Sequence, residues 1–87
     1  MPYAVVTGAS GGIGFELAKL LAADKFDLLL VARNSDKLKA AAEGIEKEFS
    51  VRVHYIPADL SQEQTPLKIY NTAIHNNFDV EVLINNA

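Results

Sequence analysis

The residues with the clearest chemistry are the glycines of segment 7–14, which reads Thr-Gly-Ala-Ser-Gly-Gly-Ile-Gly. An apolar run leads into this segment, and a helical pattern over residues 15–21 follows it. A strand that breaks at glycines and restarts as a helix leaves unpaired N–H groups at the positive end of the helix dipole, and such an end binds anions. Glycine suits positions where the backbone takes a positive φ or lies close to a phosphate. The segment therefore predicts a ligand that carries phosphate, such as a dinucleotide.

The spacing of these glycines excludes two common phosphate-binding motifs. The fingerprint G-x-G-x-x-G fails because Phe, Glu and Leu follow Gly14, and the P-loop fails because the first lysine after the glycines is Lys19. The pattern that is present, T-G-x-x-x-G-x-G, is formed by Thr7, Gly8, Gly12 and Gly14. With this pattern the sequence resembles the classical branch of the short-chain dehydrogenase/reductase family. The alternative for the glycines alone is a strand-to-helix turn that binds nothing.

The resemblance implies a cofactor-binding role for most of this loop and for three later residues. In the family, an acidic residue after the third strand contacts the adenine ring, and Asp59-Leu60 stands there. The family's N-N-A-G element, which supports the sheet and touches the cofactor ribose, is matched by Asn85-Asn86-Ala87. The alternative for Asp59 is a cap on the following turn. The implied contacts outside the second strand are Gly8, Ser10, Gly11, Gly12, Ile13, Gly14, Asp59, Leu60 and Asn86.

The end of the second predicted strand indicates which dinucleotide is bound. In dinucleotide folds a carboxylate about 20 residues beyond the glycines bonds the ribose 2′-hydroxyl, whereas a nearby arginine accepts a 2′-phosphate. Ala32 and Arg33 stand here, so no carboxylate repels a phosphate and a guanidinium can hold one. This favours NADP(H), with NAD(H) less favoured. Many family members that use NADP also carry a basic residue where this chain has Gly11, and the alternative for Arg33 is a solvated loop charge.

The residues of the family's proton transfer do not occur in the sequence. The family uses a tyrosine with a lysine four residues later, but Thr, Asp and Ile stand four residues after Tyr3, Tyr55 and Tyr70. His54 and His75 are isolated, as surface histidines usually are, and the chain has no cysteine to serve as nucleophile or thiolate ligand. We therefore predict no catalytic and no metal-binding residue within these 87 residues.

Alternating strand and helix patterns predict an α/β fold. Strands are expected at residues 3–7, 27–32, 51–56 and 80–84, with helices at 12–23 and 36–49 and a third before the last strand. The second strand is apolar without alternation, so both of its faces should be covered, whereas the third alternates like an edge strand and should stop at Pro57.

The sequence predicts a single start for the second helix but leaves two possible starts for the third. Ser35 is the expected N-cap of the second helix. The third helix could begin at a capping box of Ser61 with Gln64 or at Thr65-Pro66. Its expected buried side consists of Leu67, Tyr70, Ile74 and Phe78.

Right-handed crossovers then give a Rossmann-type doubly wound parallel sheet with strand order 3-2-1-4. The first two helices should cover one face and the third helix the other face alone. The fourth strand keeps a free edge, so we expect residues 1–87 to be the N-terminal portion of an NAD(P)-binding Rossmann domain, cut after this strand. The chain should associate through that edge, and the intact protein is expected to be a homo-oligomer.

Composition narrows the class of protein. A formal charge of −3 argues against nucleic acid as a partner, and no apolar run is long enough for a membrane span. No signal sequence is evident, so a cytoplasmic protein is expected. The favoured interpretation is the N-terminal part of an NADP(H)-dependent oxidoreductase for a carbonyl or hydroxyl compound, itself inactive. The alternatives are a stand-alone nucleotide-binding or regulatory module and an α/β piece that binds nothing.

Overall fold

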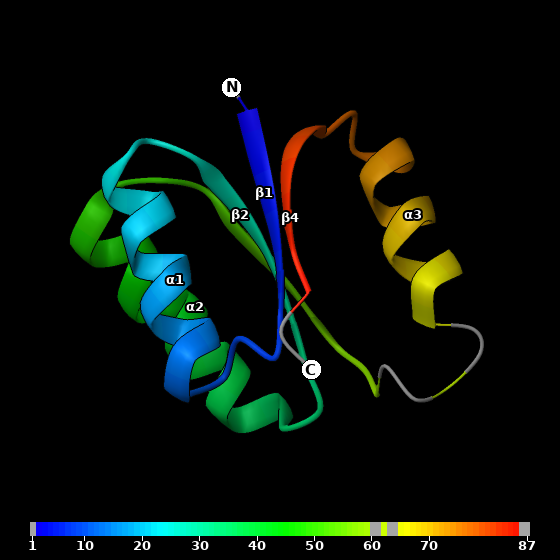
Figure 1. Cartoon of the computed structure of the whole chain (residues 1–87), viewed down its shortest axis with the longest axis horizontal. Helices are drawn as coiled ribbons and strands as arrows, with labels where there is room; N and C mark the ends of the chain where they lie inside the picture. The colour runs from blue at the N-terminus through cyan, green and yellow to red at the C-terminus, as the bar shows by residue number, and fades with distance from the viewer. Residues whose placement is uncertain (1, 60–61, 63–64, 86–87) are drawn as a thin grey trace.

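A computed structural model describes residues 2–59, 62 and 65–85, as a parallel sheet between two layers of helices (Figure 1). Leu60, Ser61, Gln64 and Asn86 lie outside the described residues. The elements, in chain order, are β1 (Pro2–Thr7), α1 (Gly12–Ala23), β2 (Asp27–Ala32), α2 (Ser35–Phe49), β3 (Val53–Pro57), α3 (Thr65–His75) and β4 (Asp79–Ile84).

The sheet has the predicted order, β3-β2-β1-β4, and every neighbouring pair is parallel. In its central register Val5 of β1 lies opposite Leu29 of β2, which lies opposite His54 of β3. Helices α1 and α2 lie on one side of the sheet and α3 on the other (Figure 1). One irregularity was not predicted: the register between β1 and β4 shifts between Tyr3 and Ala4.

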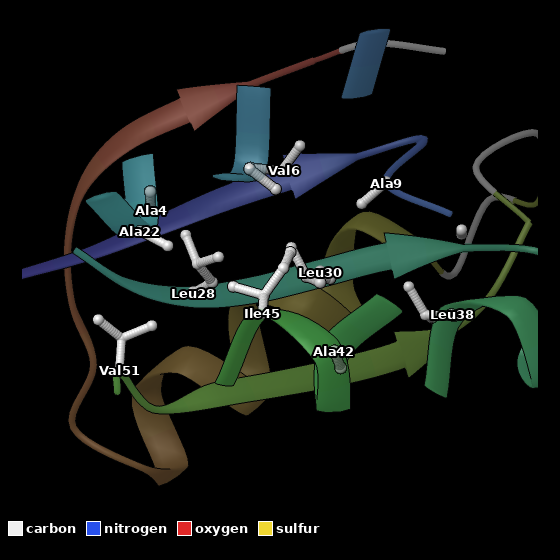
Figure 2. Close-up of a cluster of buried hydrophobic side chains, with 12 residues drawn as sticks. Ala4, Val6, Ala9, Ala22, Leu28, Leu30, Leu38, Ala42, Ile45 and Val51 are labelled. Carbon is white, nitrogen blue, oxygen red and sulfur yellow. The ribbon is translucent and has the colours of Figure 1, made fainter. Parts of the chain in front are cut away.

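The larger part of the core lies between the sheet and the first two helices. Side chains of β1, β2 and α2 meet there, among them Val6, Leu28, Leu30 and Ile45, all fully buried (Figure 2). All six residues of β2 are buried, as its apolar run after Asp27 predicted. Burying a leucine contributes about 1.5–3 kcal/mol, so this strand is the centre of the fold's stability.

The opposite face carries a smaller cluster of Val5, Leu29, Val31 and Ile56, with Ile69 of α3 packed against it. The predicted buried side of α3 is wrong: Leu67, Tyr70 and Ile74 are 59%, 62% and 59% exposed. Phe78, beyond the helix, is partly buried as predicted.

The buried side of α3 begins with a polar residue instead. Thr65 is 3% exposed, and its hydroxyl donates a hydrogen bond of 2.6 Å to the carbonyl of Asp59. This anchor turns the face of Thr65, Ile69 and Ala73 toward the sheet, since residues four apart share one side of a helix. Of the two predicted starts, the described helix begins at Thr65.

The N-cap of α2 also differs from the prediction. Asn34, not Ser35, has the extended backbone of a cap, and its Oδ1 accepts a hydrogen bond of 3.0 Å from the N–H of Lys37. Ser35 is the first helical residue. Asparagine and serine are about equally good caps, so residue type could not separate these neighbours.

Strand β3 is an edge strand, as predicted, and ends at Pro57, but it starts at Val53 rather than at Val51. The reason for the later start is that Arg52 donates its N–H to the Asp27 side chain at 2.9 Å instead of to a strand carbonyl. The next N–H, of Val53, donates to Oε2 of Glu46 on α2 at 3.1 Å. Since alternate N–H groups point to opposite sides of a strand, Val53, Tyr55 and Pro57 face the outer edge. The Val53 N–H is occupied there, and Pro57 has none.

Candidate functional site

The loop between β1 and α1 has the conformation that its glycines suggested. Gly8 and Gly12 have φ of 64° and 60°, in the left-handed region that favours glycine. A Cβ added at Gly12 would meet no atom within 4 Å, so the constraint there is backbone conformation and not space. At Gly11 the backbone is extended and the space is equally open. Neither the backbone conformation nor the space at position 11 would therefore prevent a basic residue there.

The N-terminus of α1 is the chemically important end. Among the described residues no side chain caps it, and its first turn carries no acidic residue. In contrast, α2 starts with the Asn34 cap and has Asp36 in its first turn. The first N–H groups of α1 therefore have no side-chain cap like the one that Asn34 provides to α2. Uncapped N–H groups at a helix N-terminus favour the binding of an external anion. Ile13, in that turn, is 70% exposed beside this position.

Backbone hydrogen bonds hold the loop against the neighbouring strands. The N–H of Ala9 donates to the carbonyl of Val31 at 3.2 Å, and Ala9 is fully buried. Ala9 was not among the site residues predicted from the sequence. Its position in the loop, between Gly8 and Gly11, was the signal that could have indicated it. The N–H of Ala58 likewise donates to the carbonyl of Ala32 at 2.8 Å. Arg33, directly after β2, is exposed at the same end of the sheet.

Asp59 follows β3 at this end and is half-buried. Its carbonyl accepts hydrogen bonds from the N–H of Gln62 at 3.1 Å and from the Thr65 hydroxyl. The backbone carbonyl of Asp59 thus takes part in the turn that leads into α3. Leu60, its predicted partner toward the adenine, lies outside the described residues.

A buried hydroxyl connects the loop to the end of β4. Thr7 is 3% exposed, and its Oγ1 lies 3.3 Å from the carbonyl oxygen of Ile84 and 3.2 Å from Oδ1 of Asn85. Asn85 belongs to the Asn-Asn-Ala element, but the predicted ribose contact, Asn86, lies outside the described residues. The Thr7 contact brings together two motifs from opposite ends of the sequence.

The described candidate residues therefore follow the carboxyl ends of neighbouring parallel strands, which is where open α/β sheets bind ligands. No three side chains of His, Asp or Glu in the described part of the chain are grouped as metal ligands would be. The arrangement provides backbone N–H donors, one guanidinium and polar loop groups, which suit phosphate and ribose binding.

A hollow of about 730 Å³ elsewhere on the molecule is distinct from this site. It lies beside α3, with Pro57, Lys68 and His75 in its wall. None of the described candidate cofactor residues lines it.

Comparison with protein families gives a match to the model described as short chain dehydrogenase, over residues 2–87. Among curated proteins, the chain is 37% identical over 87 residues to a very-long-chain 3-oxoacyl-CoA reductase of Candida glabrata, covering 98% of this chain and 24% of the relative. It is 40% identical over 85 residues to the protein of the same name of Kluyveromyces lactis, covering 98% and 25%. The chain thus spans about a quarter of the length of these relatives.

Solved structures agree in fold. The structure of L-sorbose reductase from Gluconobacter frateurii complexed with NADPH and L-sorbose matches with a TM-score of 0.93 and 32% identity, over 99% of this chain and 33% of that one. An alcohol dehydrogenase from the archaeon Thermococcus sibiricus complexed with 5-hydroxy-NADP matches with a TM-score of 0.93 and 37% identity, over 100% and 37%. No helix in the described segments combines the length and hydrophobicity needed to cross a membrane.

Proposed function

The chain belongs to the short chain dehydrogenase family, and from this we propose that it forms the cofactor-binding part of an oxidoreductase that acts on a carbonyl or hydroxyl compound. The observation that carries the proposal is the uncapped N-terminus of α1, behind a loop whose Gly8 and Gly12 have positive φ. Two relatives in the comparison are named as complexes with NADPH and with 5-hydroxy-NADP, which supports a nicotinamide dinucleotide.

The residues present fit such a cofactor. The first N–H groups of α1 would hold the pyrophosphate, because they combine unpaired donors with the positive end of the helix dipole. The open space at Gly11 and Gly12 allows the phosphates to approach the backbone. The bound nicotinamide would supply a hydride donor or acceptor. Asp59, and Leu60 and Asn86 outside the described residues, are proposed for the adenine and ribose.

We propose NADP(H) rather than NAD(H) as the preferred cofactor. Arg33 is exposed directly after β2, where dinucleotide folds distinguish a 2′-phosphate from a 2′-hydroxyl. No carboxylate precedes it, since Ala32 occupies the preceding position. A guanidinium binds phosphate in a planar, bidentate manner, so Arg33 would contribute both affinity and selectivity.

The 87-residue chain alone is proposed to bind the cofactor without turning it over. The tyrosine–lysine pair that the family uses for proton transfer is not in its sequence. Two further proposals accompany this one. The chain associates with a second copy through the edge of β4, whose Leu83 is 67% exposed, and the protein is cytoplasmic.

The direct test is titration of the chain with NADPH and NADH, monitored by calorimetry and by nicotinamide fluorescence. We expect saturable binding of both, with NADPH tighter. Gly12→Ala should weaken both, because alanine at positive φ costs about 1–2 kcal/mol. Gly44→Ala is the matched control, since Gly44 lies in α2 with no atom within 4 Å of an added Cβ. Absence of saturable binding by the folded chain would contradict the proposal, as would equal weakening by the two alanine variants.

A further inference from the structure

A second hollow lies at the opposite end of the sheet, where β1, β2 and β3 begin and the chain turns from α3 into β4. Figure 1 shows this end, where the β1 ribbon begins and α3 leads into β4. The hollow has a volume of about 500 Å³, and none of the residues that line it belongs to the proposed cofactor site. Its wall includes Tyr3, Asp27, Arg52, Asn76, Asn77 and Phe78. These residues serve no purpose in the proposed function.

A buried carboxylate reaches this hollow. Asp27 is 3% exposed, and its Oδ1 accepts the N–H of Arg52 at 2.9 Å. No described residue donates to its other oxygen, and no ion pair forms between Asp27 and Arg52 in the described part of the chain. No buried side-chain oxygen or nitrogen of the described residues lacks a hydrogen-bond partner. The second oxygen of Asp27 is therefore accessible, and the hollow is the space it lines.

Two helix ends add negative potential to the same wall. Ser50 is the C-cap of α2, and Asn77 lies two residues beyond the end of α3. Both have left-handed backbones, with φ of 56° and 55°. The carbonyls of a last helical turn carry the negative end of the helix dipole, which favours cations. The two helices thus present this end beside Asp27.

Aromatic rings form another part of the wall. The ring of Tyr3 stacks on that of Phe78 with centroids 3.9 Å apart, and His54 lies 4.7 Å from Phe78. Burial, and then the charge of Asp27, raise the pKa of the Tyr3 hydroxyl, while Arg52 lowers it. The electron-rich faces of aromatic rings attract cations. Carboxylate, helix ends and rings therefore favour a cation, while the guanidinium of Arg52 in the same wall opposes one.

We propose that this hollow binds an organic cation through a primary ammonium group. A primary ammonium has three N–H donors, which suit a carboxylate oxygen and the side-chain carbonyls of Asn76 and Asn77. A metal ion suits the site less well, because the described residues provide no group of three His, Asp or Glu side chains for one. The proposal does not depend on the cofactor site.

The test titrates the chain with n-butylammonium chloride and follows backbone amide and aromatic ring resonances by NMR. Sodium chloride at equal ionic strength measures the salt effect, and tetramethylammonium chloride tests the need for N–H donors. We expect saturable shifts at Asp27, Asn77 and the rings of Tyr3 and Phe78, with a dissociation constant of about millimolar for so small a ligand. Tetramethylammonium should bind more weakly.

Asp27→Asn keeps an oxygen for the Arg52 N–H and removes the charge, so butylammonium binding should weaken about tenfold or more. Asp24→Asn, at the exposed C-cap of α1, is the matched control and should change binding less than about twofold. Phe78→Leu is a second, independent test, in case the Asp27 variant does not fold. It keeps the carboxylate and removes one aromatic ring, so it should weaken butylammonium binding severalfold. Shifts no larger than those with sodium, or variants that bind like the wild type, would overturn the proposal.

Discussion

The hydroxyl of Thr7 lies 3.2 Å from Oδ1 of Asn85, although 78 residues separate the two in the chain. The same hydroxyl lies 3.3 Å from the carbonyl of Ile84. Because a hydroxyl has one proton, it can donate to only one of them at a time, and a turned Asn85 amide would donate to it instead. The pair joins the end of β1, where the glycine loop begins, to the end of β4.

Replacing Thr7 tests the strength of this connection. Thr7→Val keeps the β-branched shape and removes the hydroxyl, so the free energy of unfolding should fall by about 1 kcal/mol. Thr7→Ser restores the hydroxyl and should recover part of that loss. Urea unfolding followed by circular dichroism measures both. Equal stability of the valine variant and the wild type would mean that the connection does not stabilise the fold.

Arg33→Ala tests the choice of cofactor. Removing a charge-assisted contact to the 2′-phosphate should weaken NADPH binding about tenfold or more and leave NADH binding nearly unchanged. Lys39→Ala, an exposed change on α2, is the control for loss of a positive charge. Both are measured by calorimetric titration. If NADPH and NADH affinities fall equally, Arg33 does not recognise the phosphate.

Two neighbouring alanine variants test the N-cap of α2. Asn34→Ala removes the acceptor of the Lys37 N–H and should lower the free energy of unfolding by about 1 kcal/mol. Ser35→Ala, one residue later and inside the helix, should change it by less than about 0.5 kcal/mol. Chemical unfolding of the two variants in parallel gives the comparison. If Ser35→Ala lowers the free energy of unfolding more than Asn34→Ala does, Ser35 is the N-cap, as the sequence predicted.

Association through β4 is tested by placing a lysine on each edge of the sheet. Leu83→Lys on β4 should raise the dimer dissociation constant about tenfold or more, since lysine on an edge strand opposes strand pairing. Tyr55→Lys on β3 should leave association unchanged. Light scattering over a range of concentrations measures both. A wild-type chain that stays monomeric at the highest concentration would refute this mode of association.

Much of the fold was predictable because it depends on local sequence patterns, such as apolar runs and glycines at the ends of elements. After Asp27, the residues of β2 from Leu28 to Ala32 are apolar without interruption, and all six residues of the strand are buried. The bounds of α1 were predicted as observed, at Gly12 and Ala23, because glycines mark its start and its apolar spacing is regular. The strand order followed from the alternation of elements and the handedness of crossovers.

The parts that could not be predicted depend on contacts between distant segments. Helix α3 has apolar residues on two sides, and the Thr65 contact with Asp59 decides which side is buried. The later start of β3 depends on the Asp27 side chain, 25 residues before Arg52. In the candidate site, residue types indicated the loop glycines and Arg33, but the Thr7 contact with Asn85 requires the folded sheet.

The two edges of the sheet differ in the backbone N–H groups that they offer to another strand. On β3, Glu46 already occupies the Val53 N–H and Pro57 has none, so two of the three outward backbone positions of that edge cannot donate to another strand. If the chain associates through β4 as proposed, we expect it to have one main end for strand pairing, whereas a filament requires two. Pairing of β4 with β4 would consume that end in both copies, so growth should terminate at the dimer and not continue into fibrils.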